Sequence, residues 1–142
     1  MKARDLMTSE VIAVRPETPT DHVAKLLFEH RIGACPVIDE NGALTGMVSA
    51  WDLIFALLAE GEPGSEEFVA RILRSKGTAR DVMGGPIITV TEETDVAEIA
   101  RILIQYRINR VPVVRDARLV GIVSRGDMLR ALVQERVSAA AP

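Results

Sequence analysis

A long internal repeat limits the folds open to this chain of 142 residues. The motif Ala-Arg-Asp-x-Met starts at Ala3 and again at Ala79, and the motif Arg-Ile-x-x-x-Pro-Val starts at Arg31 and again at Arg107. Each copy, of about 55 residues, is too small to bury a good core by itself. We therefore expect the two copies to pack against one another with pseudo-twofold symmetry.

The same order of elements is expected in both copies. A short apolar strand comes first, and Thr18 or Thr94 then caps a helix whose apolar residues recur at helical spacing. Two further strands, joined by a hairpin turn, lead into a closing helix. The predicted fold class is α+β, with two β-α-β-β-α repeats. The expected strands are at 11–14, 36–38 and 45–48 in the first copy and at 87–90, 112–114 and 120–123 in the second.

A change of composition between the copies marks a linker. Residues 60–64 combine glycine, proline and glutamate, which end a helix, and residues 65–73 are typical of a short amphipathic helix with a capped, acidic start. The small residues at the end of the chain are typical of a frayed terminus. The predicted organisation is a first repeat at 1–60, a linker at 61–78, a second repeat at 79–136 and a flexible tail at 137–142.

Charge and composition argue against several classes of function. The net charge is −3 at pH 7, and no basic stripe with interleaved aromatic residues occurs, so DNA or RNA is not an expected partner. No apolar run is long enough to cross a bilayer, so no membrane contact is expected either. The single cysteine, Cys35, cannot form an internal disulfide, and we expect it in the core of a cytoplasmic protein.

A Ser-x-x-Asp motif stands between an apolar strand and a helix in each copy. It comprises Ser49 and Asp52 in the first copy, and Ser124 and Asp127 in the second. One interpretation is a capping box, in which the two side chains satisfy free backbone N–H groups of the first helical turn. The other is a nucleotide site, because a helix N-terminus attracts phosphate and an aspartate one turn in can accept hydrogen bonds from ribose hydroxyls. The motif by itself leaves both interpretations open.

No catalytic constellation is evident in the sequence. Neither serine of the Ser-x-x-Asp motifs has a histidine base in its sequence context, which argues against hydrolase chemistry. His22 and His30 stand at helical positions expected to be exposed, without cysteines or carboxylates at metal-ligand spacing. We therefore expect no enzymatic activity, no bound metal and no required cofactor.

The repeated unit resembles a CBS domain, named after cystathionine β-synthase. The resemblance rests on Asp-x-Met near the start of each unit, on Arg-Ile-x-x-x-Pro-Val and on the terminal Gly-x-x-Ser-x-x-Asp, in this order and in duplicate over residues 3–133. It implies a regulatory pair that binds adenosine derivatives in two clefts where the repeats meet. Each cleft would combine the Ser-x-x-Asp motif of one repeat with the pre-proline segment of the other.

Carried over residue by residue, the resemblance implies two sets of site residues. In each set the aspartate holds ribose, the serine and any nearby arginine hold phosphate, and backbone groups beside apolar residues hold the adenine edge. The first set is Met47, Ser49, Asp52, Ile88, Ile108, Asn109, Arg110 and Pro112. The second set is Ile122, Ser124, Arg125, Asp127, Ile12, Ile32, Gly33, Ala34 and Pro36.

The two copies differ at positions that bear on the ligand. Arg110 and Arg125 stand where the first copy has alanine, so we expect both sites to prefer phosphorylated ligands. Met7 is followed by Thr8, whereas Met83 is followed by two glycines and a proline, so one hydroxyl is missing in the second copy.

The predicted function is that of a stand-alone regulatory module. AMP, ADP, ATP or a related adenosyl ligand would occupy the clefts and alter the state of an unidentified partner protein. The alternative is a ligand-free structural domain for dimerisation, in which both motifs only cap helices. We expect a homodimer that forms through apolar helix faces which a single pair of repeats leaves uncovered. These faces comprise Leu53, Phe55, Leu57, Leu58, Leu129, Leu132 and Val133.

Overall fold

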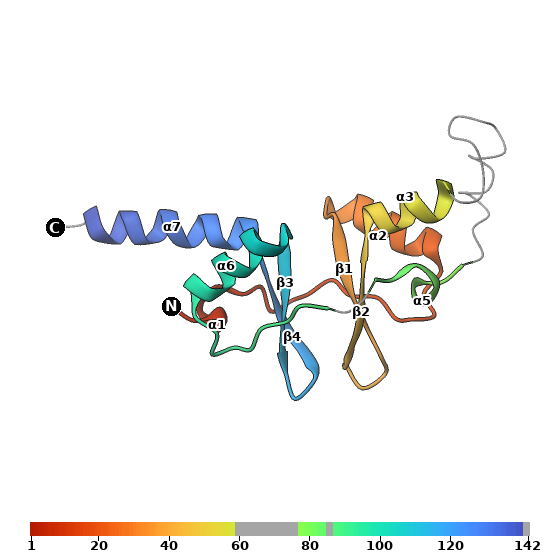
Figure 1. Ribbon diagram of the computed structural model, residues 1–142, viewed down its shortest axis with the longest axis horizontal. Coiled ribbons are helices and arrows are strands. Elements are labelled where there is room, and N and C mark those ends of the chain that lie inside the picture. Colours follow the sequence, from red (N-terminus) through yellow and green to blue (C-terminus); the bar gives the residue numbers. More distant parts are fainter. Residues whose placement is uncertain (59–76, 85–86, 141–142) are drawn as a thin grey trace. The chain divides into compact units, whose positions relative to one another are not determined.

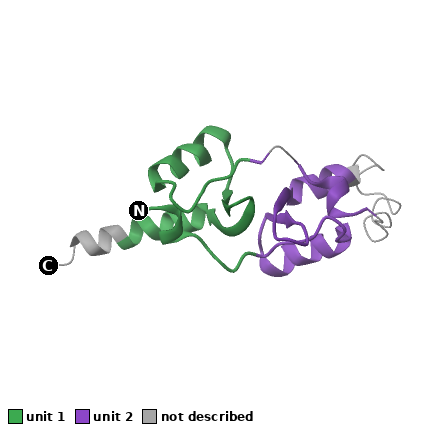
Figure 2. Cartoon of the chain, turned by 90° about the horizontal axis from the view of Figure 1, so that it is seen from below, with its two compact units in different colours: residues 1–11, 88–142 green, residues 12–87 purple. Residues whose placement is uncertain are grey.

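The computed structural model describes residues 1–58, 77–84 and 87–140 (Figure 1). The chain forms two compact units: unit 1 comprises Met1–Val11 and Ile88–Pro142, and unit 2 comprises Ile12–Ile87 (Figure 2). Each unit combines helices with a two-stranded antiparallel sheet, so the predicted α+β class is confirmed. The predicted linker helix at 65–73 lies outside the described residues.

Unit 2 is built around an antiparallel hairpin. Strand β1 (Ala34–Ile38) pairs with β2 (Leu44–Ser49), and Cys35 lies opposite Val48. Both of these side chains are fully buried, so this pair faces the core. The helices described in this unit are α2 (Thr20–His30), α3 (Ala50–Leu58) and the short α5 (Ala79–Val82).

Unit 1 has the same arrangement. Strand β3 (Arg110–Arg115) pairs with β4 (Arg118–Ser124), and Val111 lies opposite Val123, again with both side chains fully buried. The helices described in this unit are the short α1 (Ala3–Leu6), α6 (Val96–Tyr106) and α7 (Arg125–Ala140). Helix α7 thus extends beyond residue 136, where we expected the second repeat to end.

The two sequence repeats exchange their first segments. Helix α1 opens the first repeat but belongs to unit 1, where Thr8 and Ile122 exchange two backbone hydrogen bonds. Helix α5 opens the second repeat but belongs to unit 2, where the N–H of Gly84 donates to the carbonyl of Met47. Each compact unit therefore contains a segment that is distant in sequence from much of the rest of that unit.

Two glycines allow the exchanged segments to come close. A Cβ atom at Gly121 would lie 2.5 Å from the Sδ of Met7, and one at Gly46 would lie 2.5 Å from the Sδ of Met83. A side chain at either position would displace the methionine, because protein interiors are close-packed. The glycine of each Gly-x-x-Ser motif therefore makes room for the methionine of an Ala-Arg-Asp-x-Met motif.

The first expected strand of each copy is wrong. Within residues 11–14 and 87–90, only Val14 and Val90 pair with a strand, as single parallel bridges to Val37 and Val113. A four-residue apolar run is compatible with an extended segment as well as with a strand, so the pattern could not separate the two.

The threonine caps expected for the long helices are also wrong. Neither N-cap residue, Pro19 of α2 or Asp95 of α6, makes a side-chain capping bond. Thr18 Oγ1 instead accepts a hydrogen bond from the backbone N–H of Arg15 at 3.0 Å, and Thr94 makes the equivalent bond in its own copy. Both threonines therefore close the turn that precedes the helix.

Each unit has its own hydrophobic core. Val23 in unit 2 and Ile99 in unit 1 are fully buried at corresponding positions of α2 and α6. Cys35 lies in the core of unit 2, as expected. Leu53 packs there as well, with only 8% of its surface exposed, so its expected place on an uncovered helix face is wrong.

An exposed ion pair connects the end of β3 to the turn before α6. Arg115 Nε donates to Glu92 Oε1 at 2.6 Å, and Arg115 Nη2 donates to Glu92 Oε2 at 2.9 Å. These hydrogen bonds hold the pKa of the Glu92 carboxyl below its ordinary value. Because the pKa is lowered in the folded chain, the stabilisation is present above the pKa of the unfolded chain. It is lost as the pH falls through the folded-state value.

Replacing Arg115 with glutamine should therefore reduce the loss of stability in acid. Urea midpoints measured from about pH 7 down to about pH 3 should fall less in Arg115→Gln than in the wild type, because the pKa of Glu92 returns toward its ordinary value. Arg118→Gln, at the exposed start of β4, is the matched control and should keep the wild-type profile. Parallel profiles for the wild type and Arg115→Gln would contradict this linkage.

Candidate functional site

In unit 2, the Ser-x-x-Asp motif forms the turn between β2 and α3. The backbone N–H of Ser49 donates to Asp52 Oδ2 at 2.8 Å, and the backbone N–H of Asp52 donates to Ser49 Oγ at 3.0 Å. This reciprocal pair is a capping box, so that interpretation of the motif is confirmed. Both residues are half-buried, and no described residue donates a hydrogen bond to Asp52 Oδ1.

In unit 1, Ser124 and Asp127 form the same capping box between β4 and α7. Asp127 Oδ2 accepts the backbone N–H of Ser124 at 2.8 Å and its hydroxyl at 3.0 Å, while Ser124 Oγ accepts the N–H of Asp127 at 3.2 Å. Asp127 Oδ1 accepts hydrogen bonds from Thr8 Oγ1 at 3.3 Å and from Arg130 Nη2 at 2.5 Å. The Asp127 side chain is only 5% exposed, and its negative charge is compensated by donors from its own unit.

The first turn of α3 keeps capacity for an anion. Its first N–H, from Ala50, donates to the carbonyl of Gly33 at 2.8 Å, and the N–H of Asp52 is taken by the capping serine. The N–H of Trp51 between them has no partner among the described residues. Because a helix N-terminus also carries partial positive charge, a phosphate oxygen beside Ser49 would be stabilised there.

Each pre-proline segment lies beside the Ser-x-x-Asp turn of its own repeat. The registers of the two hairpins place Ala34 opposite Ser49 and Arg110 opposite Ser124. The first N–H of α7 donates to the carbonyl of Asn109 at 2.9 Å. The hairpins thus bring members of both predicted motifs together within one repeat.

The predicted site residues are distributed over both units. Those of unit 2 are Ile12, Ile32, Gly33, Ala34, Pro36, Met47, Ser49 and Asp52. Those of unit 1 are Ile88, Ile108, Asn109, Arg110, Pro112, Ile122, Ser124, Arg125 and Asp127. The expected combination of residues from the two repeats in one cleft stays a prediction.

Sequence reasoning missed two donors to Asp127. Arg130 follows it by three residues on α7, a spacing that puts two side chains on the same helix face and could have been recognised. Thr8 precedes it by 119 residues, and only the exchange of first segments brings the two together. The sequence shows that Thr8 supplies a hydroxyl after Met7 that the second copy lacks after Met83, but it does not show which residue this hydroxyl contacts.

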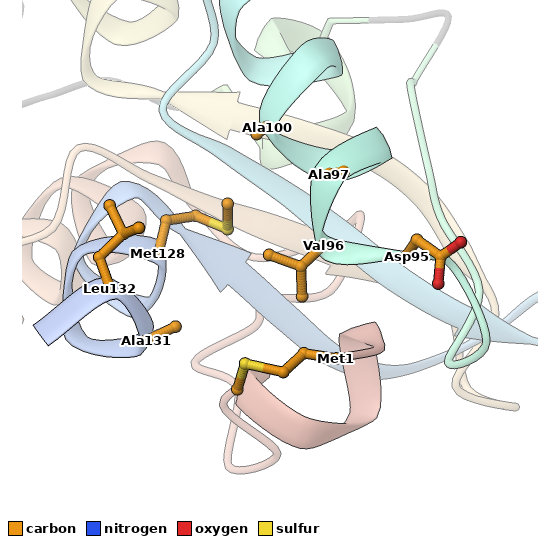
Figure 3. Close-up of a pocket in the computed structure, with 8 residues that line it drawn as sticks. All are labelled: Met1, Asp95, Val96, Ala97, Ala100, Met128, Ala131 and Leu132. Carbon is orange, nitrogen blue, oxygen red and sulfur yellow. The ribbon is translucent and has the colours of Figure 1, made fainter. Parts of the chain in front are cut away.

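Unit 1 also contains an apolar hollow of about 510 Å³ between the start of the chain and helices α6 and α7 (Figure 3). Asp95, the one lining residue with a charged side chain, pairs with Lys2 at 2.8 Å, which lowers the pKa of the Asp95 carboxyl. None of the predicted site residues lines this hollow, so it is separate from the Ser-x-x-Asp turn. Its lining consists of Met1, Asp95, Val96, Ala97, Ala100, Met128, Ala131 and Leu132.

Other kinds of site find little support. His22 and His30 lie exposed on α2, as expected. Within residues 1–58, 77–84 and 87–140, no group of three or more His, Cys, Asp or Glu residues could hold a metal ion. No helix in this part of the chain combines the length and apolar character needed to span a membrane.

Comparison with known proteins supports the resemblance. The chain matches the family model of the CBS domain at residues 3–59 and 79–134. It is 34% identical over 138 residues to CBS domain-containing protein CBSX1, chloroplastic, of Arabidopsis thaliana, a match that covers 85% of this chain and 58% of CBSX1. The chain thus spans less than two thirds of that relative.

Two of the similar solved structures contain adenosine derivatives. The structure of CBSX2 from Arabidopsis thaliana in complex with AMP is 32% identical, with a TM-score of 0.79, over 95% of this chain and 98% of that one. The CBS domain pair of protein MJ0100, in complex with 5′-methylthioadenosine and S-adenosyl-L-methionine, is 27% identical, with a TM-score of 0.73, over 95% of this chain and 98% of that one.

The two ranges of the family match agree with the two repeats of the sequence. The match falls on both repeats, extends in each of them beyond the Ser-x-x-Asp motif, and leaves out the whole of the predicted linker at 61–78. The chain therefore belongs to the CBS domain family and carries two CBS domains in tandem.

Proposed function

We propose that this chain is a regulatory module that binds adenine nucleotides or related adenosyl ligands at its Ser-x-x-Asp motifs and signals to a partner protein. The observation that carries the proposal is the half-buried Asp52 carboxylate, whose Oδ1 has no hydrogen-bond donor among the described residues. Such an oxygen can accept hydrogen bonds from ribose hydroxyls. The AMP and S-adenosyl-L-methionine in related CBS structures support an adenosyl ligand.

Each part of the ligand has a proposed partner. Asp52 or Asp127 holds the ribose, and Ser49 or Ser124, at the start of a helix, holds the phosphate. Backbone groups of the pre-proline segments hold the adenine edge. The ligand acts as a signal, so the proposed module needs no cofactor and catalyses no reaction.

A titration of the purified chain tests this proposal. Calorimetry with AMP, ADP, ATP and S-adenosylmethionine should show saturable binding of at least one of them. Inorganic phosphate is the control, because it shares the charge of the nucleotides but offers no ribose to an aspartate. Failure of all four ligands to bind at concentrations of about 1 mM, equivalent to about −4 kcal/mol, would reject the proposal.

The alternative function is a structural domain for dimerisation without a ligand. The complete capping boxes at both motifs favour it, because they give each serine and aspartate a structural role. The same titration separates the two functions, since this alternative predicts no heat of binding for any nucleotide.

We further propose a homodimer formed through helices α3 and α7. Phe55 is 64% exposed, and Leu129, Leu132 and Val133 are exposed to 61–62%, which leaves large apolar side chains in water. The side chains of Leu57 and Leu58 lie outside the described residues. Sedimentation velocity at micromolar concentration should give a dimer, and Leu132→Lys should weaken it by about 1 kcal/mol or more. A monomeric wild type would contradict this prediction.

A phosphate preference should depend on two arginines. Arg110 is half-buried opposite Ser124, and Arg125 is the exposed first residue of α7. A guanidinium forms strong charge-assisted bonds to phosphate, which a neutral nucleoside lacks. Arg110→Ala and Arg125→Ala should therefore each weaken AMP binding about tenfold while leaving adenosine binding nearly unchanged.

The control for both variants is Arg101→Ala, whose arginine is exposed on α6 and paired with Glu98. It should alter the affinity for neither ligand. An equal loss of adenosine and AMP affinity in Arg110→Ala or Arg125→Ala would show that the arginine does not contact phosphate.

We also propose a cytoplasmic location and a protein receiver of the signal. Cys35 is buried and is the single cysteine of the sequence, so it has no internal disulfide partner, which supports a reducing compartment. Crosslinking in cells of the chain's own source, with and without depletion of adenine nucleotides, would identify a receiver whose contact with the chain depends on the ligand.

A further inference from the structure

The two Ser-x-x-Asp turns differ in how their aspartates are paired. We name the turn that ends at Asp52 the first-repeat site and the turn that ends at Asp127 the second-repeat site. In both, Oδ2 of the aspartate accepts the backbone N–H of the serine at 2.8 Å. Oδ1 of Asp127 also accepts hydrogen bonds from Thr8 and Arg130, whereas no described residue donates to Oδ1 of Asp52.

This difference originates in the sequence of the repeats. When the two Ser-x-x-Asp motifs are aligned, Arg130 corresponds to Phe55, and when the two Ala-Arg-Asp-x-Met motifs are aligned, Thr8 corresponds to Gly84. A phenylalanine and a glycine have no side-chain donor. The first-repeat site therefore lacks both groups that pair with Oδ1 of Asp127.

The Asp127 carboxylate has no capacity left for a ligand. A carboxylate offers about four lone-pair positions, and its two oxygens here already accept from the Ser124 N–H, the Ser124 hydroxyl, Thr8 and Arg130. A ribose must therefore displace at least one of these donors. The bond from Arg130 is charge-assisted and short, at 2.5 Å, whereas that from Thr8 is long, at 3.3 Å.

We propose that Arg130 sets the ligand affinity of the second-repeat site by competing with the ribose for Oδ1 of Asp127. The inference rests on the proposed function, and it makes the two sites unequal: a neutral nucleoside binds more tightly at the first-repeat site than at the second. The Arg130 side chain is 58% exposed, so it can turn into solvent when a ligand displaces it. Arg130 thus determines ligand specificity without contacting the ligand, by occupying the Asp127 oxygen that the ribose needs.

Adenosine titrated into the full chain that carries Asp52→Ala tests this inference, because that substitution isolates the second-repeat site. Adding Arg130→Met, which keeps the unbranched stem and removes the donors, should tighten adenosine binding roughly three- to tenfold. Arg130→Gln keeps one amide donor and should tighten it less. Arg101→Met is the matched control, because Arg101 on α6 pairs with Glu98, three residues before it, just as Arg130 pairs with Asp127. This substitution should leave adenosine binding unchanged.

Each outcome decides between the possibilities. Unchanged or weaker adenosine binding in Arg130→Met would overturn the inference. If Arg130→Met does not fold, Arg130→Gln takes its place, and unchanged or weaker adenosine binding in that variant would overturn the inference. If Asp52→Ala abolishes adenosine binding and Arg130→Met does not restore it, the inference is rejected while the proposed function stands. A chain with Asp52 and Arg130 intact that binds no adenosyl ligand would reject the proposed function and the inference together.

Discussion

Replacing Asp52 with alanine is expected to weaken AMP binding by about 1.5–3 kcal/mol, a loss of affinity of roughly 10- to 100-fold. The reason is that hydrogen bonds to a charged group are stronger than those between neutral groups. In the proposed complex the carboxylate accepts such bonds from the ribose, and the variant leaves the hydroxyls unpaired at a half-buried position. Calorimetric titration with AMP at fixed ionic strength measures the change.

The same substitution removes a helix cap, so a second variant must separate binding from stability. Loss of the cap should lower the free energy of unfolding by about 1 kcal/mol. Asp81→Ala is the matched control, because Asp81 accepts the backbone N–H of Thr78 at 2.8 Å in the capping box of α5, in the same unit. It should lower the melting temperature without altering AMP affinity. If Asp52→Ala behaves in the same way, Asp52 is only a cap.

Replacing Ile99 with alanine is expected to lower the free energy of unfolding by about 2–5 kcal/mol. Ile99 is fully buried on α6, in the core cluster that also contains Val111 and Val113. The substitution removes apolar surface from the core and leaves a cavity that close-packed neighbours fill only in part. Urea unfolding followed by circular dichroism measures the loss.

Ile104→Ala controls for the effect of the substitution on the helix itself. Ile104 lies on the same helix, but 78% of its surface is exposed. Its replacement should therefore change the free energy of unfolding by no more than about 0.5 kcal/mol. Comparable losses at the two positions would contradict the described core of unit 1.

The sequence by itself determined the features that depend on residues close together in the chain. The two hairpins form where apolar runs flank turn residues, and the capping boxes join residues three apart, such as Ser49 and Asp52. The burial of Cys35 followed from its apolar surroundings. The expected strand at 11–14 and the cap at Thr18 were wrong, because several local structures suit such short patterns.

Only the tertiary structure decided which segments complete each unit. Both repeats begin with Ala-Arg-Asp-x-Met and both contain the glycine that accommodates its methionine, so the sequence is compatible with packing within a repeat or with exchange. Long-range contacts settle the choice, such as the backbone pairing of Thr8 with Ile122 and the ion pair of Lys2 with Asp95. That choice brings Thr8 to Asp127 across 119 residues, so that Thr8 and Arg130 both pair with the same aspartate.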